Sequence, residues 1–142
     1  MIKKKVIVLG AGMVGRAIAL DLAQRYDVTA ADIDEQKLAH LRAEAPIRTV
    51  TADLSHAETV KKLVADHDLV IGAVPGFLGF QTLKAVIEGG KNIVDISFFA
   101  EDPFQLDALA TQKGVTAVVD CGVAPGMCNL LLGYHNARMT VE

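Results

Sequence analysis

The sequence predicts an α/β domain with a doubly wound parallel sheet of about six strands and helices on both faces. Short apolar runs alternate with helical patterns along the whole chain, which is the pattern of repeated βαβ units. The composition is 51% hydrophobic but only 5% aromatic, and such small aliphatic side chains suit strands that are buried on both faces. A glycine-rich turn follows the first apolar run, at the place where a strand would pass into a helix.

The first half of the chain contains three predicted strands and three predicted helices. Asp34 is a residue type that caps helix N-termini, and Pro46 ends the helix that Asp34 opens. Ser55 and Glu58 match a capping box and predict the start of the next helix. The strands are expected at 5–9, 28–31 and 47–51, and the helices at 13–24, 34–44 and 55–65.

The second half continues the alternation. Pro75-Gly76 is expected to end the fourth strand, and Gly89-Gly90 to close the helix that follows. Asp102-Pro103 is typical of an N-cap followed by proline at the first helical position. The strands are expected at 69–74, 93–96 and 115–119, and the helices at 80–88, 102–114 and 125–138. Six strands joined by right-handed crossovers favour the Rossmann fold with strand order 3-2-1-4-5-6.

The glycine-rich turn predicts a dinucleotide site. Gly10-Ala11-Gly12-Met13-Val14-Gly15 fits G-x-G-x-x-G between a strand and an amphipathic helix. Gly10 permits the tight turn, Gly12 lets the pyrophosphate approach the backbone, and Gly15 lets the helix pack closely on the strand. The phosphates, together with Met13 and Val14, are then expected at the helix N-terminus, where free N–H groups favour negative charge.

Asp32 ends the second predicted strand, twenty residues after Gly12. A carboxylate at this position can accept hydrogen bonds from the ribose hydroxyls of the adenosine half. A 2′-phosphate would meet like charge, and the next residues are Ile33 and Asp34 rather than arginine. We therefore expect NAD to be preferred over NADP, by roughly tenfold or more.

Other candidate contacts follow the third and fourth strands, because ligands of such sheets cross the carboxyl ends of the strands. Asp53 and Leu54 are expected near the adenine, although Asp53 can equally be a turn or capping residue. Ala73, Val74 and Pro75 lie on the path towards the nicotinamide, with a simple Pro-Gly turn as the alternative.

Five polar or small residues are expected to face the reactive end of the site: Asp95, Ser97, Asp120, Cys121 and Gly122. A cysteine nucleophile needs a neighbouring base, and the sequence shows none beside Cys121. We therefore expect a structural role for this cysteine. The sequence identifies no catalytic residue, and it indicates no metal site.

Charge and hydropathy exclude two classes of partner. The formal net charge is −3, so a basic surface for nucleic acid is not expected. The longest uncharged run, 69–83, contains glycine and proline and is too short to span a bilayer. Two cysteines provide no disulfide framework. These features predict a soluble, cytoplasmic protein that binds small molecules.

Three segments together suggest a family: the glycine motif, the run Val94 to Phe99 followed by Asp102-Pro103-Phe104, and the run Asp120 to Met127. The chain resembles the saccharopine dehydrogenase-like family along essentially its whole length, and within that family it is most similar to lysine 6-dehydrogenases. The resemblance implies NAD(P)-dependent chemistry at a carbon–nitrogen bond of an amino acid. For lysine 6-dehydrogenases it implies oxidative deamination of the lysine side-chain amine.

The resemblance also implies a longer protein. Residues 1–124 would form the dinucleotide-binding domain, and residues 125–142 would lead into a second domain that supplies the substrate pocket and the contacts of a homo-oligomer. On this hypothesis the present chain binds the cofactor but has no activity alone. Two alternatives stay open: a non-catalytic NAD-sensing module of a potassium-transport system, and a reductase for saccharopine or a carboxylated polyamine.

Overall fold

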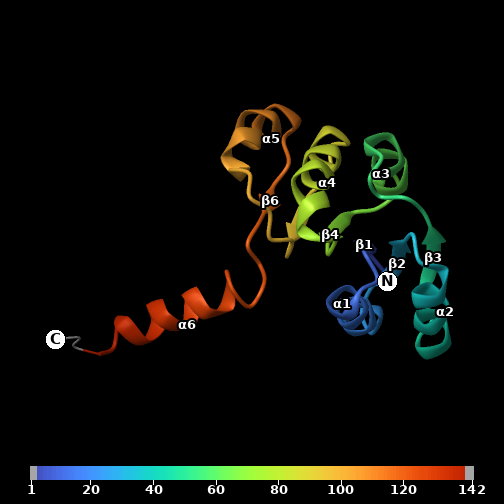
Figure 1. The fold of residues 1–142 in the computed structure, drawn as a ribbon, viewed down its shortest axis with the longest axis horizontal. Coiled ribbons are helices and arrows are strands. Elements are labelled where there is room, and N and C mark those ends of the chain that lie inside the picture. Colours follow the sequence, from blue (N-terminus) through green and yellow to red (C-terminus); the bar gives the residue numbers. More distant parts are fainter. Residues whose placement is uncertain (1–2, 140–142) are drawn as a thin grey trace.

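Six parallel strands form one sheet in the order β3-β2-β1-β4-β5-β6 (Figure 1). The structure is a computed structural model that describes residues 3–139. The strands are β1 (Lys5–Leu9), β2 (Asp27–Asp32), β3 (Arg48–Thr51), β4 (Leu69–Gly72), β5 (Ile93–Asp95) and β6 (Ala117–Val118). Every pairing between neighbouring strands is parallel, so the predicted fold class and strand order are confirmed.

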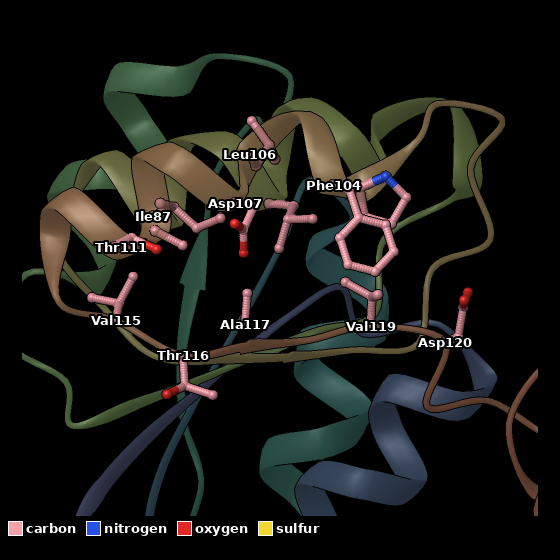
Figure 2. Close-up of a pocket in the computed structure, with 13 residues that line it drawn as sticks. Ile87, Phe104, Leu106, Asp107, Thr111, Val115, Thr116, Ala117, Val119 and Asp120 are labelled. Carbon is pink, nitrogen blue, oxygen red and sulfur yellow. The ribbon is translucent and has the colours of Figure 1, made fainter.

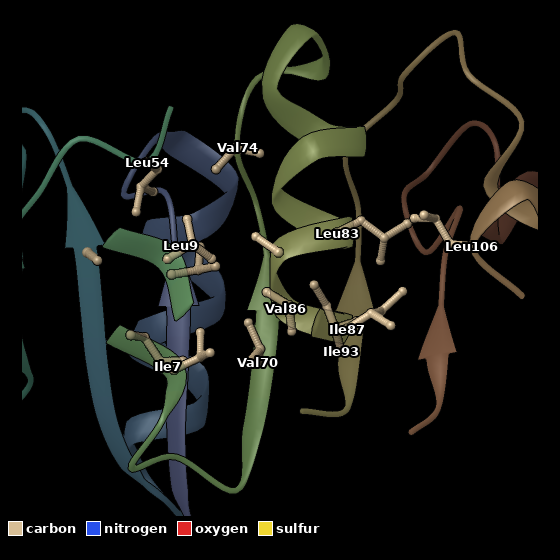
Figure 3. Packing of buried hydrophobic residues seen from close by; sticks show 14 residues of the cluster. Ile7, Leu9, Leu54, Val70, Val74, Leu83, Val86, Ile87, Ile93 and Leu106 are labelled. Atoms are coloured by element: carbon tan, nitrogen blue, oxygen red, sulfur yellow. The ribbon is translucent and has the colours of Figure 1, made fainter. Parts of the chain in front are cut away.

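Helices cover both faces of this sheet (Figure 1). They are α1 (Met13–Ala23), α2 (Glu35–Glu44), α3 (Ala57–Val64), α4 (Gly76–Glu88), η1 (Pro103–Leu106), α5 (Asp107–Lys113) and α6 (Met127–Asn136). α1 and α2 pack on one face, whereas α3, α4 and η1 pack on the other. Side chains of a strand alternate between faces, so Ile7 and Leu9 enter one apolar cluster while Val6 and Val8 enter the other. Figure 3 shows the cluster beneath α3 and α4.

α6 extends away from the sheet (Figure 1). Leu130, Leu131 and Leu132 on this helix are all exposed. The predicted second segment, 125–142, therefore contributes a separate helix, and its last three residues lie outside the described part of the chain. No helix within residues 3–139 is both long enough and apolar enough to cross a membrane.

Two predicted helix starts were wrong. α4 begins at Gly76 instead of residue 80, because Pro75 takes the N-cap position in place of a turn. α3 begins at Ala57, and its N-cap, His56, makes no side-chain capping bond. His56 takes the N-cap position instead of Ser55, whose N–H donates at 2.9 Å to the carboxylate of Asp53 in the turn before the helix.

Thr82 is a buried polar residue of α4. The residue is 1% exposed, and its Oγ1 has no hydrogen-bond partner among the described residues. A buried polar atom without a partner costs about 1–3 kcal/mol. We expect Thr82→Val, which keeps the shape of the side chain, to raise the free energy of unfolding by about 1 kcal/mol. Urea denaturation measures this change, and a loss of stability would show that the hydroxyl has a partner in solution.

Candidate functional site

The glycine-rich turn packs tightly against the end of β4. The N–H of Gly10 donates to the carbonyl of Ala31, and the N–H of Ala73 donates to that of Leu9, both at 2.8 Å. Gly10 has a φ of +103°, and a Cβ at this position would overlap the carbonyl oxygen of Ala73. A Cβ on Gly15 would likewise overlap the carbonyl of Gly10. The two glycines thus allow the turn to lie directly between β1, β4 and α1.

The N-terminus of α1 is free to receive an anion. Its N-cap, Gly12, has no side chain, and the first turn contains no acidic residue. Met13 and Val14, the first two residues of the helix, are 91% and 54% exposed. A Cβ on Gly12 would touch nothing within 4 Å, so the space above the backbone is open. Unpaired N–H groups and the helix dipole favour a phosphate at such a position.

Asp32 lies beside this turn, and its carboxylate faces the protein. Oδ2 accepts the N–H of Ala11 at 2.7 Å, and Oδ1 accepts the N–H of Asp34 at 2.9 Å. The residue is only 9% exposed. Lys37, in the first turn of α2, places its Nζ 4.0 Å from Oδ1 of Asp32 and 3.5 Å from Oδ2 of Asp34. Asp32 therefore fixes the glycine turn, and a lysine partly offsets its charge.

The two candidate residues after β3 lie in different surroundings: Asp53 is in a turn, and Leu54 is in the core. Asp53 accepts the N–H of Ser55 through its carboxylate, and hydrogen bonding from the Ser55 side chain, followed by that from its N–H, lowers the pKa of Asp53. Leu54 is 7% exposed and packs in the core near Leu9 (Figure 3). The structure thus places Asp53 in a turn, which is the alternative interpretation given above.

Residues after β4 run along the edge of the glycine turn. Ala73 presents its carbonyl to Gly10. Val74 is buried, and its carbonyl accepts the Ser97 hydroxyl at 3.1 Å. Pro75 is exposed at the start of α4. Backbone atoms of this segment therefore hold the ends of β1, β4 and β5 together.

Asp95 is fully buried at the end of β5. Its Oδ1 accepts the N–H of Ser97 at 2.7 Å, whereas Oδ2 has no partner among the described residues. Gly72 leaves the space for this carboxyl group, since a Cβ there would lie 2.7 Å from Oδ1. Burial raises the pKa of Asp95, the hydrogen bonds from Ser97 lower it, and the charge of Asp120 raises it further.

Stability should therefore depend on the ionisation of Asp95. A carboxyl whose pKa is raised by folding favours the folded state only while it is protonated. Its contribution is fully present below the ordinary aspartate pKa and is lost as the pH rises through the raised value. We expect Asp95→Asn to be more stable than the wild type at neutral pH, and the difference to vanish in acid. Chemical denaturation of both proteins across this pH range measures the effect, and a pH-independent difference would contradict it.

Cys121 follows Asp120 after β6, and its N–H donates to the backbone carbonyl of Asp95 at 3.1 Å. Burial, followed by the charges of Asp95 and Asp120, raises the pKa of the Cys121 thiol. The thiolate is the nucleophilic form of cysteine, so this environment does not activate the residue. Asp120 has a φ of +58°, a left-handed conformation that aspartate adopts more readily than most other residues. Among residues 3–139 no group of three or more His, Cys, Asp or Glu side chains is arranged to hold a metal.

An apolar cavity of about 450 Å³ lies between α4, α5 and β6 (Figure 2). Leu83, Ile87 and Val119 line the cavity, and Phe104 and Asp120 lie together at one end of it. The glycine turn contributes nothing to its lining. The cavity is therefore separate from the glycine turn, and the sequence did not predict it.

Comparison with known proteins identifies the family. Residues 6–118 match the family described as the saccharopine dehydrogenase NADP binding domain. The chain belongs to this family. The α-aminoadipic semialdehyde synthase of Rattus norvegicus is 28% identical over 91% of the chain. The NADP(+)-dependent, L-glutamate-forming saccharopine dehydrogenase of Pyricularia oryzae is 27% identical over 92%. The apo structure of saccharopine dehydrogenase from Saccharomyces cerevisiae has the same fold, with a TM-score of 0.82 and 24% identity over 91% of the chain.

This saccharopine dehydrogenase-like domain spans only part of those relatives: 14% of the rat protein and 29% of each fungal protein. The comparisons correct the predicted cofactor preference. The family is one of NADP-binding domains, and the fungal relatives are NADP(+) enzymes, so the prediction that NAD is preferred over NADP was wrong. That prediction treated Asp32 as a free carboxylate and considered only the two residues after it, whereas both Asp32 oxygens bind backbone and the nearby cation, Lys37, comes from α2.

Proposed function

We propose that this domain binds NADP(H) across the carboxyl ends of its strands and serves a dehydrogenase that acts on the carbon–nitrogen bond of an amino acid. The glycine turn is the observation that supports this most strongly. Gly12 leaves the N-terminus of α1 open, and Gly10 brings that terminus to the gap between β1 and β4, where the strand order reverses. Dinucleotides bind at this point of a doubly wound sheet.

The residues around the turn fit the parts of NADP(H). The first N–H groups of α1 would hold the pyrophosphate, beside Met13 and Val14. Each oxygen of Asp32 carries one backbone hydrogen bond, and a carboxylate oxygen can accept a second bond, here from ribose. Lys37 is half exposed, and its ammonium group would contact the 2′-phosphate.

We propose a substrate whose reacting carbon lies next to a side-chain nitrogen. The sequence resemblance favours the side-chain amine of lysine. The names of the relatives point to saccharopine, which is a lysine substituted on its side-chain nitrogen. Loss of hydride from the lysine carbon bonded to that nitrogen would leave a carbon–nitrogen double bond, and hydrolysis of this bond by water would release L-glutamate. Both substrates would thus give up hydride from the same lysine carbon, and NADP+ would supply the hydride acceptor.

The binding half of the proposal is tested by titrating the 142-residue chain with NADPH. We expect saturable binding, seen in NADPH fluorescence, and a rise in the unfolding temperature with ligand concentration. Absence of both would overturn the proposal. Lys37→Met should weaken NADPH more than NADH, since only NADPH carries the phosphate that lysine would contact.

The reaction half needs the gene product that carries this domain. Lysine and saccharopine are each deuterated at the lysine carbon that is bonded to the side-chain nitrogen, and each is supplied together with NADP+. The deuterium content of the reduced cofactor is then measured by mass spectrometry. Transfer of deuterium from either substrate supports the proposed chemistry. Cofactor binding without any transfer would overturn the reaction while leaving the binding function intact.

A further inference from the structure

Large apolar side chains are exposed at the carboxyl ends of several strands. Met13 in the glycine turn and Ile33 after β2 are 91% and 68% exposed. Phe77 in the first turn of α4 is 84% exposed, and Phe98 after β5 is 73% exposed. Single exposed apolar residues are ordinary on protein surfaces. A group of them along one edge of a domain, beside a nucleotide site, indicates a surface that a ligand covers.

The backbone segments that carry Phe77 and Phe98 are in contact with each other. A Cβ on Gly76 would overlap the carbonyl oxygen of Phe98, so the first turn of α4 lies directly against the loop after β5. The hydroxyl of Ser97 joins the same loop to the carbonyl of Val74. Both phenylalanines are therefore attached to a fixed part of the site.

The neighbouring residue, Phe99, anchors the loop on its inner side. Its ring packs edge-on against Phe80 of α4, with 5.8 Å between ring centroids. Gly79 makes room for this ring, since a Cβ there would lie 2.6 Å from a Phe99 ring carbon. Phe99 is thus held inward, while Phe98 is left on the outside. The sequence alone does not tell these two adjacent phenylalanines apart.

We propose that Phe77 and Phe98 form the apolar wall that holds the nicotinamide ring, an assignment that rests on the NADP(H) binding proposed above. β2 and β3 lie on one side of β1, and β4 and β5 lie on the other. The two halves of a dinucleotide extend to opposite sides of the pyrophosphate. Asp32, at the end of β2, marks the adenosine half. The nicotinamide half therefore extends over the ends of β4 and β5, where the two phenylalanines are.

The chemistry of the ring suits such a wall. The oxidised ring is a cation, and the face of a phenyl group attracts cations. The reduced ring is uncharged and flat, and contact with phenyl groups removes its apolar surface from water. One ring face against this wall leaves the opposite face open to the substrate, so Phe77 and Phe98 act as positioning residues.

The test compares two ligands on the isolated chain: NADPH, and 2′,5′-ADP as the adenosine half alone. We expect Phe77→Ala and Phe98→Ala each to weaken NADPH binding about tenfold, equivalent to about 1.4 kcal/mol. Binding of 2′,5′-ADP should stay unchanged in both variants. Tyr134→Ala is the matched control, because this aromatic residue is 51% exposed on α6, outside the sheet. The control should bind both ligands as the wild type does.

The outcomes separate this inference from the function on which it rests. Normal NADPH binding in both phenylalanine variants overturns the inference alone. Equal losses for NADPH and 2′,5′-ADP also overturn it, because they indicate a general disturbance of the site. A wild-type chain that binds neither ligand overturns the proposed function as well. Thermal unfolding of each variant verifies that it is folded during the titration.

Discussion

Gly10→Ala is expected to destabilise the chain by about 3 kcal/mol or more. Two costs combine at this position. The φ of +103° is one that L side chains rarely adopt, and the new methyl group would overlap the carbonyl oxygen of Ala73. That oxygen belongs to the backbone at the end of β4, so it cannot move aside without disturbing the sheet. Since domains are stable by only about 5–15 kcal/mol, urea denaturation should show a much lower midpoint.

Gly114→Ala is the matched control for this prediction. Gly114 also has a positive φ, +63°, at the C-terminus of α5, but a Cβ there would meet nothing within 4 Å. The control carries the cost of a left-handed backbone, about 1–2 kcal/mol, without the overlap. Equal losses in the two variants would contradict the claim that close packing against Ala73 dominates at Gly10.

Gly12→Ala is expected to abolish most NADPH binding while leaving the fold unchanged. Gly12 has an extended backbone conformation that any residue adopts, and its Cβ position is open. Stability should therefore stay within about 0.5 kcal/mol of the wild type. In the complex, the pyrophosphate would approach this same space, and a methyl group there should reduce affinity by about a hundredfold.

Titration with NADPH and thermal unfolding of the free protein together test this prediction. Gly133→Ala on α6 serves as the control, because its Cβ also meets nothing within 4 Å and the helix lies away from the sheet. This variant should bind NADPH normally. If Gly12→Ala did so too, the pyrophosphate would not lie against the start of α1.

The sheet order and the glycine turn were predictable because they depend on local patterns. Apolar runs that alternate with helical segments leave few ways to arrange parallel strands, and the spacing from Gly10 to Asp32 is a property of the chain itself. The start of α4 was missed because its local sequence fits two structures. Pro75-Gly76 is typical of a turn, yet proline is also tolerated at the start of a helix, and packing against the loop after β5 decides between these two outcomes.

The details of the candidate site depend on contacts between residues far apart in sequence. The bond from Ala11 to Asp32 joins residues 21 apart, and no spacing rule states which way that carboxylate turns. The buried state of Asp95 similarly requires Gly72 on the neighbouring strand. Such pairings follow from the register of the sheet, which the sequence does not display.

The two backbone bonds of Asp32 have a kinetic consequence. Hydrogen bonds to a carboxylate are about twice as strong as neutral ones, and these two tie the glycine turn to β2 and to the residue before α2. The turn is thus already shaped before any ligand arrives, and little conformational entropy remains to be lost on association. Cofactor capture should therefore be a single-step process whose observed rate rises linearly with ligand concentration, without the plateau that a slow loop rearrangement would impose.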